Sequence, residues 1–238
     1  MQTRPLIPEP ASSSFALQST LNHIALIMDG NRRWARGRNV PGSAGHEAGL
    51  DRLIKLLPEL ESSGARTVTV FAFSAANWRR HSTEVRRLFQ LAESALQRLT
   101  PECIERGIRV SVIGRRDRLP RSLLTAADRT ALLTANGTRE LRVALDYSSR
   151  QSILEAARAL PPSGSMTELE ALLGLDGTTT QVDLLIRTGK EQRLSDFLLW
   201  ESAFAELYFA DCHWPDFTAA ELRRAIAWYH QRQRRFGA

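Results

Sequence analysis

The feature that most constrains the fold of this chain is a repeated alternation of short apolar runs with longer segments of helical periodicity. The runs are rich in Val, Ile and Phe, which is typical of buried strands. The intervening segments place leucines at three- and four-residue steps, which is typical of amphipathic helices. We expect strands at residues 23–28, 67–73, 108–113, 141–147 and 182–186, and helices at residues 45–64, 83–105, 120–134, 151–160 and 222–232.

Strands that alternate with helices predict an α/β fold with a mainly parallel central sheet flanked by helices. The 238 residues suit one domain, and neither an internal repeat nor a long interior linker marks a boundary. Residues 1–21 contain three prolines and three consecutive serines but no apolar segment typical of a signal peptide. We therefore expect a flexible arm over residues 1–21 and one domain over residues 22–238.

Composition narrows the function classes. No segment approaches the roughly 20 apolar residues that span a bilayer. Cys103 and Cys212 match no metal or redox spacing, so we expect reduced thiols and a cytoplasmic protein. The formal net charge of +6 favours anionic partners such as phosphates, nucleic acid or an acidic membrane surface.

Polar clusters follow three of the apolar runs, at the strand ends where ligands bind in such sheets. The first, residues 29–34, offers in Asp29 a carboxylate that suits Mg²⁺. It also offers in Gly30 a position where a backbone amide can approach a phosphate closely. An Asx turn with a glycine hinge explains the same segment without a ligand. His46 is the only histidine near this cluster, at a predicted helix start, although a lone histidine is more often structural.

The second and third clusters are residues 74–80 and 187–195. In the second, Asn and Arg side chains could bind polar atoms of a substrate, with the Trp78 ring forming one side of the site. The alternative is a strand-to-helix loop in which the Trp78 indole packs against the protein. The third contains two arginines, a lysine, a serine and a glycine, and arginine binds phosphate oxygens in a bidentate manner. A solvated charged loop is the alternative there. The glycines of residues 37–43 have P-loop spacing but lack its lysine, so we reject a P-loop.

The three clusters together closely resemble the undecaprenyl diphosphate synthase, or cis-prenyltransferase, family. Residues 29–35, DGNRRWA, followed by the Gly45-His46 pair, are similar to its first motif, and residues 71–78, FAFSAANW, to its second. Residues 182–189 with 191–199 resemble its third, and residues 205–209, 214–217 and 234–237 complete the C-terminal end. The resemblance covers about residues 22–238.

The resemblance implies a reaction and roles for named residues. It implies that isopentenyl diphosphate condenses with an allylic diphosphate to give a cis-prenyl diphosphate, with Mg²⁺ as cofactor. Asp29 is expected to bind this Mg²⁺ with assistance from Glu206, and Asn77 and Ser74 are expected near the reacting centre. The substrate-binding residues that it implies are Gly30, Asn31, Arg32, Arg33, Trp34, His46, Trp78, Arg80, Arg187, Arg193 and Ser195. Arg187, Arg193 and Ser195 are expected to grip isopentenyl diphosphate.

The resemblance also implies partners and a product site. We expect a homodimer whose site borrows residues from the partner's C-terminal segment, no nucleic-acid partner, and at most loose membrane association. The growing chain needs a dry apolar tunnel, for which the sheet face and the helix at residues 83–105 are the candidates. Phe89 on this helix either limits elongation or is an ordinary core phenylalanine.

Several positions depart from the family pattern. Arg32 stands where glycine is usual, Gly42 where many members have arginine, and Ala76 where glutamate is usual. The other departures are Lys190, Asp196 and the pair Ser148-Ser149. They leave open an irregular, lavandulyl-type coupling of two allylic units. A non-catalytic subunit of a cis-prenyltransferase complex is a further alternative, but the retained Asp29 and the retained arginines speak against it.

Overall fold

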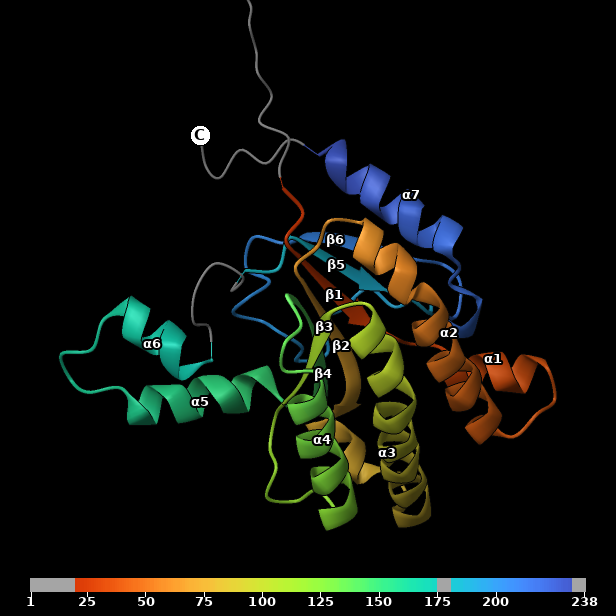
Figure 1. The fold of residues 1–238 in the computed structure, drawn as a ribbon, viewed down its shortest axis with the longest axis horizontal. Helices are drawn as coiled ribbons and strands as arrows, with labels where there is room; N and C mark the ends of the chain where they lie inside the picture. The colour runs from red at the N-terminus through yellow and green to blue at the C-terminus, as the bar shows by residue number, and fades with distance from the viewer. Residues whose placement is uncertain (1–19, 175–180, 233–238) are drawn as a thin grey trace, which may run out of the picture.

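A six-stranded parallel sheet forms the centre of the computed structural model, which describes residues 20–174 and 181–232 (Figure 1). Its strands are β1 (His23–Ile27), β2 (Thr67–Ser74), β3 (Ile108–Ile113), β4 (Arg139–Tyr147), β5 (Leu184–Arg187) and β6 (Glu206–Phe209). They pair in the order β3-β4-β2-β1-β5-β6, and every pair is parallel. The α/β fold predicted from the alternation is confirmed.

Helices cover the sheet, and two of them extend away from it. The helices are α1 (Asn31–Gly37), α2 (Gly42–Ser62), α3 (Ser82–Glu105), α4 (Arg121–Leu133), α5 (Ser149–Ala159), α6 (Met166–Leu172) and α7 (Ala219–His230), with short 3-10 turns η1 (Ala75–Arg79) and η2 (Trp214–Asp216). In Figure 1 α2, α3, α4 and α7 flank the sheet, whereas α5 and α6 project to one side. No helix within the described ranges has the length and apolar character needed to cross a bilayer.

The central strands are apolar on both faces, which is why they give continuous hydrophobic runs in the sequence. In β1, Ile24 and Leu26 enter the larger core cluster, which includes residues of α2, α3, α4 and α7. Ala25 and Ile27 of the same strand enter a smaller cluster on the opposite face. Both cysteines are free, and Cys103 is buried in the larger cluster.

The structure adds elements that the sequence patterns did not reveal. Helix α1 follows Gly30 directly where only a turn was expected, strand β6 forms the edge of the sheet, and the two-turn helix α6 follows the loop at residues 161–164. Leu21, assigned to the N-terminal arm, is 5% exposed and belongs to the core, so the arm ends before it. The rest of the expected arm, apart from Thr20, lies outside the described residues.

His23, at the start of β1, makes stability depend on pH. Its side chain is 1% exposed, and burial, with the Arg142 charge second, lowers its pKa from 6.5 to about 4. Between pH 6.5 and about pH 4, the His23 imidazole is protonated in the unfolded chain but stays neutral in the folded chain. We therefore expect the free energy of unfolding to fall by about 3 kcal/mol from pH 7 to about pH 4. Urea unfolding of the wild type and a His23→Gln variant measures this, and equal pH slopes would contradict it.

Candidate active site

A cavity of about 970 Å³ opens at the carboxyl ends of β1, β2 and β5 and continues beneath α2 and α3. Polar side chains from all three predicted clusters line one part of it: Asp29, Arg32, Arg33, Ser74, Asn77, Arg80, Arg187, Arg193 and Ser195. Aliphatic side chains line the remainder, among them Leu50, Leu53, Leu91, Ala92, Ala95, Leu96, Leu99 and Val143. The expected apolar tunnel between the sheet face and α3 is therefore present, with a charged region at one end.

Asp29 lies at the centre of the charged region, just after β1. Its Oδ1 accepts hydrogen bonds from the Gly30 amide at 2.6 Å and from Arg33 Nη2 at 3.1 Å. Its Oδ2 accepts one from Arg187 Nη2 at 2.9 Å. Partial burial favours the neutral acid, but the hydrogen bond and charge of Arg187, supported by Arg33, hold the pKa of Asp29 below its ordinary value. The carboxylate therefore stays ionised at neutral pH.

Arg187, the last residue of β5, connects Asp29 to the third cluster. The residue is 3% exposed, and its Nη1 donates to Ser195 Oγ at 2.8 Å and to the carbonyl oxygen of Arg193. Arg33 Nη1 forms an ion pair with Glu191 Oε1 at 3.0 Å, and Glu191 also pairs with Arg193. The three arginines thus share two carboxylates in one network.

Tight backbone geometry brings these groups together. Gly189 has φ 86°, and a Cβ there would lie 2.7 Å from Arg33 Nη2 and 3.1 Å from the Asp29 carbonyl oxygen, so only glycine fits without a shift. The next residue, Lys190, also has a positive φ of 66°. Gly30 has φ 104°, and a Cβ there would lie 2.6 Å from His213 Nδ1. The glycines are required by close packing around Asp29.

Local hydrogen bonds position three polar side chains that line the cavity, those of Asn31, Ser74 and Asn77. Asn31 Nδ2 donates to the Met28 carbonyl oxygen at 3.1 Å, and its Oδ1 is packed against Gly49. Ser74 caps η1, its Oγ accepting from the Ala76 amide at 3.1 Å. The Ser74 amide donates to Asn77 Oδ1 at 3.1 Å. Ser74 and Asn77 both line the cavity.

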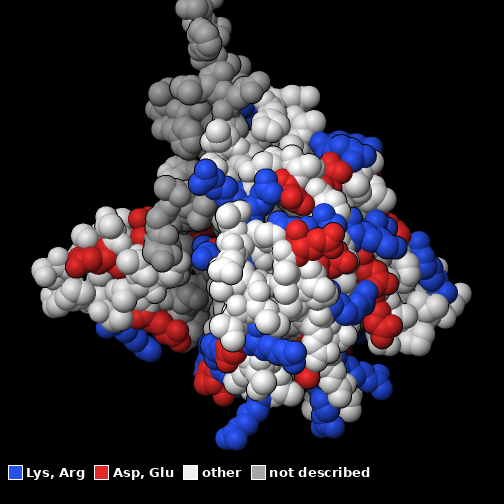
Figure 2. All heavy atoms as spheres, in the orientation of Figure 1, with Lys and Arg blue, Asp and Glu red and all other residues white. Residues whose placement is uncertain are grey.

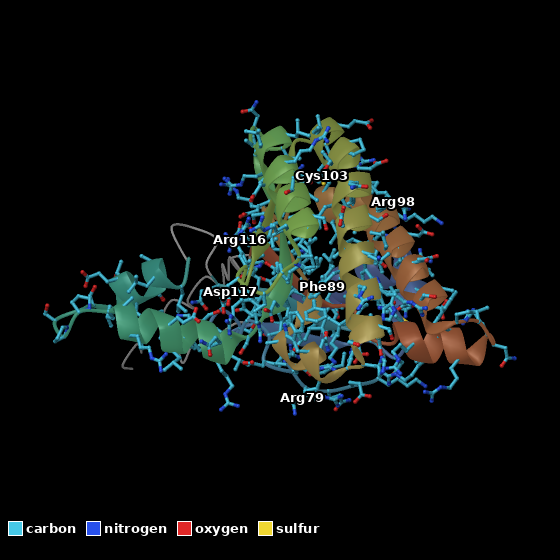
Figure 3. The ribbon with its side chains drawn as sticks, turned by 90° about the horizontal axis from the view of Figure 1, so that it is seen from below. Arg79, Phe89, Arg98, Cys103, Arg116 and Asp117 are labelled. Carbon is cyan, nitrogen blue, oxygen red and sulfur yellow. The ribbon has the colours of Figure 1, made fainter. Side chains whose placement is uncertain are left out.

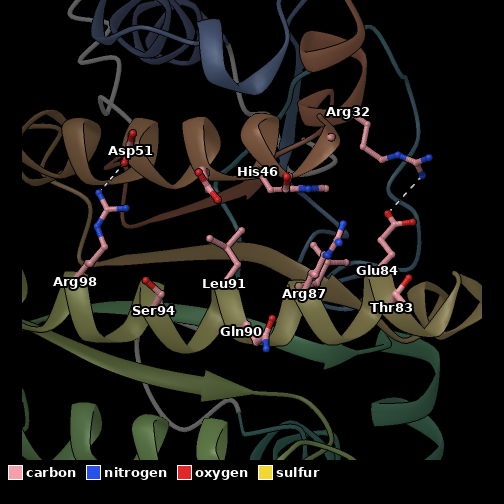
Figure 4. A pocket seen from close by; sticks show the side chains of 14 residues that line it. Arg32, His46, Asp51, Thr83, Glu84, Arg87, Gln90, Leu91, Ser94 and Arg98 are labelled. Carbon is pink, nitrogen blue, oxygen red and sulfur yellow. Dashed lines mark hydrogen bonds and ion pairs between the residues drawn. The ribbon is translucent and has the colours of Figure 1, made fainter. Parts of the chain in front are cut away.

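A second group of charges borders the cavity toward a groove of about 730 Å³ between α2 and α3 (Figure 4). Glu84 pairs with Arg80 at 3.0 Å and with Arg32 at 3.6 Å. Burial, with the Arg80 charge second, lowers the pKa of His46, so its imidazole is neutral at neutral pH. A Cβ on Gly42 would lie 3.9 Å from Arg32 Cγ, so the stem of Arg32 passes beside the position where many members have arginine.

Two tryptophans that were expected in the site form hydrogen bonds with residues outside the cavity lining. Trp34 was expected among the substrate-binding residues, but its Nε1 donates to Asp216 Oδ1 at 2.8 Å and it faces η2. Trp78 was expected beside the allylic chain, but its Nε1 donates to Asp146 Oδ1 at 2.8 Å. Its ring packs into the core, with its centroid 5.3 Å from that of Phe89. Neither tryptophan lines this cavity, so the expected contacts of both with substrate remain predictions.

Glu206 and Phe89 also lie outside the cavity lining. Glu206 opens β6 in register with Leu184, at the amino end of the sheet, and pairs with Arg232 at 3.1 Å. Asp29 follows the carboxyl end of β1, so the two carboxylates lie at opposite ends of the sheet in this chain, and a shared role in metal binding remains a prediction. Phe89, on α3 (Figure 3), is 5% exposed and belongs to the larger core cluster, which favours the interpretation of an ordinary core phenylalanine.

The cavity also contains charged side chains that the sequence did not single out. Arg36, Arg79, Arg150 and Asp196 all line it. Arg150 lies in the first turn of α5, far along the chain from the other clusters; the sequence placed it only as the arginine of the family's Gly-Gly-Arg segment, with no site role. Asp196 had been noted only as a departure from the family pattern.

The side chains around Asp29 are compatible with a Mg²⁺ site that includes substrate phosphates. No group of three His, Cys, Asp or Glu side chains with metal-binding geometry occurs within residues 20–174 and 181–232. Mg²⁺, however, commonly binds through one or two carboxylates together with substrate phosphates and water. Asp29, ionised and exposed to the cavity beside the arginines, fits such a site.

Comparison with known proteins agrees with this geometry. The family model described as "Putative undecaprenyl diphosphate synthase" matches residues 27–237. The chain belongs to the undecaprenyl diphosphate synthase family. It is 42% identical over 228 residues to isoprenyl transferase 1 of Bradyrhizobium diazoefficiens, covering 94% of this chain and 93% of that protein. It is 43% identical over 225 residues to the (2E,6E)-farnesyl-diphosphate-specific ditrans,polycis-undecaprenyl-diphosphate synthase of Pseudomonas aeruginosa, covering 90% of each.

Two solved structures of the same family share the fold. Lavandulyl diphosphate synthase from Lavandula x intermedia, in complex with dimethylallyl diphosphate, superposes with a TM-score of 0.88 at 35% identity, covering 92% of this chain and 99% of that one. A probable undecaprenyl diphosphate synthase from Campylobacter jejuni gives 0.79 at 28% identity with the same coverage. A lavandulyl diphosphate synthase and a probable undecaprenyl diphosphate synthase therefore both have this architecture.

Proposed function

We propose that this chain condenses isopentenyl diphosphate with an allylic diphosphate to form a cis-prenyl diphosphate. The observation that carries the proposal is the single cavity in which an arginine and aspartate network meets an aliphatic wall. The network suits two diphosphate groups, and the wall suits a prenyl chain. Membership of the undecaprenyl diphosphate synthase family supports the same reaction.

The reaction requires that an allylic carbon separate from its diphosphate. Arg32, Arg33 and Arg80 lie where they can neutralise the negative charge that grows on the leaving group, which is electrostatic stabilisation of the transition state. Arg187, Arg193 and Ser195 hold the diphosphate of the isopentenyl unit, so that its double bond faces the allylic carbon. A carbon–carbon bond then forms, the acceptor unit loses a proton, and the aliphatic wall keeps water from the cation.

Mg²⁺, when bound at Asp29, supplies further positive charge for the allylic diphosphate. Ser74 and Asn77 hold the rim of the cavity beside the reacting carbons, because their mutual hydrogen bonds fix η1 there. Asp29 in turn orients Arg187 and Arg33 toward the phosphates through its two carboxylate oxygens. These residues need form no covalent intermediate with the substrate.

We also propose that the chain forms a homodimer and acts in the cytoplasm. The edge strand β6 pairs only with β5 among the described strands. Phe204, close to that edge, is 65% exposed, and Leu207 within it is 37% exposed. On the projecting helices Leu154 and Met166 are exposed as well. A second copy of the chain would bury these apolar groups.

Charge distribution speaks against a nucleic-acid partner. Figure 2 shows basic and acidic side chains interspersed over the visible face, with no continuous basic stripe along it. Many of the arginines form ion pairs with neighbouring carboxylates. A surface that tracks a phosphate backbone would instead present unpaired basic residues in a row.

The direct test supplies radiolabelled isopentenyl diphosphate and Mg²⁺ with dimethylallyl, geranyl or farnesyl diphosphate as primer. The products are sized after dephosphorylation. Longer prenols from any primer support the proposal and give the chain length. A branched ten-carbon product from dimethylallyl diphosphate alone would indicate irregular coupling, and no product from any combination would favour a non-catalytic subunit.

Ala95→Phe is expected to shorten the product. Ala95 lines the aliphatic part of the cavity from α3, and a benzyl group there would occupy space that the growing chain needs. Sizing of the dephosphorylated products measures the change. Gln97→Phe, which adds the same group to an exposed position of α3, is the matched control and should leave the product unchanged. A product of wild-type length from Ala95→Phe would place the growing chain elsewhere.

A further inference from the structure

Asp196 joins the anion-binding loop after β5 to the first turn of α5. Its Oδ2 accepts from Ser148 Oγ at 2.5 Å, and its Oδ1 accepts from the backbone amide of Arg150 at 2.9 Å. Its carbonyl oxygen accepts from the Ser149 amide at 3.0 Å. In the return direction, the Leu199 amide donates to Ser149 Oγ at 3.0 Å. Four hydrogen bonds thus hold two segments together that are about 50 residues apart in the chain.

The backbone at this junction is left-handed in two successive residues. Ser195 has φ 53° and Asp196 has φ 66°, values that L residues rarely adopt. This turn directs Ser195 Oγ toward Arg187 Nη1 at 2.8 Å. The hydrogen bonds to Asp196 offset the unfavourable conformation, so the position of Ser195 depends on the contact with α5.

Arg150 is the charged side chain that this junction brings to the cavity. Its backbone is fixed by Asp196, and its exposed side chain lines the same cavity as Arg193 and Ser195. Unlike Arg33, Arg187 and Arg193, it forms no ion pair with a carboxylate of the described chain.

The local charge balance shows what Arg150 adds. The positive charges of Arg33, Arg187 and Arg193 are matched by Asp29, Glu191 and Asp196, which all lie within the same hydrogen-bonded region. A diphosphate that entered this region would meet no net positive charge from these six side chains. Arg150 supplies one additional cation at the junction with this loop, and Arg36 and Arg79 supply others in the cavity lining.

We infer that Asp196 is a positioning residue that holds Arg150 at the cavity, where the guanidinium binds the diphosphate of the isopentenyl substrate. The inference rests on the proposed function for the identity of this ligand. The Ser148 hydroxyl completes the junction by donating to the second carboxylate oxygen of Asp196. Two departures from the family pattern, Ser148 and Asp196, are therefore direct hydrogen-bond partners.

Arg150→Gln tests the binding role, because it removes the charge from an exposed side chain and leaves the backbone contact with Asp196. The KM for isopentenyl diphosphate is expected to rise about tenfold, as for loss of one charge-assisted hydrogen bond. The KM for the allylic primer and kcat should stay within about twofold of the wild type. Arg158→Gln, on the same helix but away from the cavity, is the matched control. An unchanged KM for isopentenyl diphosphate, or an equal rise for both substrates, would overturn the inference.

Variants of Asp196 test the positioning role. Asp196→Ala should reproduce the rise in KM for isopentenyl diphosphate, whereas Asp196→Asn keeps an oxygen for the Arg150 amide and should stay near the wild type. Adding Arg150→Gln to Asp196→Ala should produce no further rise, because both changes remove the same contact. Independent, multiplicative effects would show that Asp196 acts only on the stability of the loop.

Calorimetric titration with isopentenyl diphosphate separates this inference from the proposed function. If the wild type binds it about tenfold more tightly than Arg150→Gln but makes no prenyl product, the proposed function fails and the binding role stands. If the wild type is active and the two proteins bind it equally, the inference fails and the proposed function stands. Circular dichroism of each variant verifies that it is folded.

Discussion

Asp29→Asn is expected to lower kcat by a factor on the order of 10³, because the variant loses the anionic charge that orients the arginines and suits Mg²⁺. The fold should survive with a reduced free energy of unfolding. Arg187 is 3% exposed, and its Nη2 loses an ionised acceptor at Asp29 Oδ2. Because Asp29 itself is partly exposed, we expect this loss to cost only about 1–2 kcal/mol. Steady-state turnover and urea unfolding measure the two effects separately.

Asp117→Asn provides the comparison for this change. Asp117 pairs with Arg115 on the surface at 2.5 Å and lies outside the cavity, so its loss should alter neither kcat nor KM. Near-normal turnover by Asp29→Asn would remove Asp29 from the reaction. Loss of turnover together with loss of cooperative unfolding would mean that the residue is mainly structural.

Phe89→Ala is expected to destabilise the protein by about 3–5 kcal/mol, the range for removing a buried phenylalanine. The ring lies 4.8 Å from that of Phe73 and 5.3 Å from that of Trp78, measured between centroids, in the core beneath α3. Because Phe89 does not line the cavity, the length of the prenyl product should not change. Thermal unfolding and product sizing test the two parts of this prediction.

Gln90→Ala is the control for Phe89→Ala, since Gln90 is the next residue along α3 and faces the outer groove. It should leave both stability and product length near the wild type. A longer product from Phe89→Ala would show that the ring limits elongation after all. A stability loss of well under 1 kcal/mol would contradict its placement in the core.

The sequence was informative where one strand end determines the position of a side chain. Asp29 and Arg187 directly follow the apolar runs of β1 and β5, which are neighbours in the sheet, so their meeting could be predicted. Parallel strands bring their carboxyl ends to one edge whatever the details of packing. The apolar tunnel followed for the same reason, since α3 has to cover the sheet with its aliphatic face.

Side-chain direction within helices and turns was not available from the sequence. Trp34 and Trp78 belong to the correct segments but point to Asp216 and Asp146, which are distant in the chain. Phe89 and Leu88 are neighbours on α3, yet only Leu88 lines the cavity. A step of one residue along α3 turns the side chain from the core toward the cavity. The apolar periodicity of α3 in the sequence is compatible with either direction.

Strand β6 explains why the position of Glu206 relative to Asp29 could not be predicted. Its four residues give too short a pattern to predict an edge strand, so the end of the sheet at which Glu206 lies could not be inferred. Helix α6 is similarly short, and its one local signal was the capping box formed by Ser165 and Glu168. Arg150 reaches the cavity only through the Asp196 contact, which links residues that are 46 positions apart.

The ion pairs within the cavity affect which anions can bind there. Arg187 already holds Asp29, and Arg33 and Arg193 already share Glu191, so an incoming ligand competes with acids that belong to the chain itself. Orthophosphate is too small to replace several of these partners at once, and it has no hydrocarbon to place against the aliphatic wall. A prenyl diphosphate can replace several of these partners and also pack its hydrocarbon chain against the aliphatic wall. The free energy gained by burying that chain offsets the loss of the ion pairs. We therefore expect this network to bind small competitor anions more weakly than prenyl diphosphates.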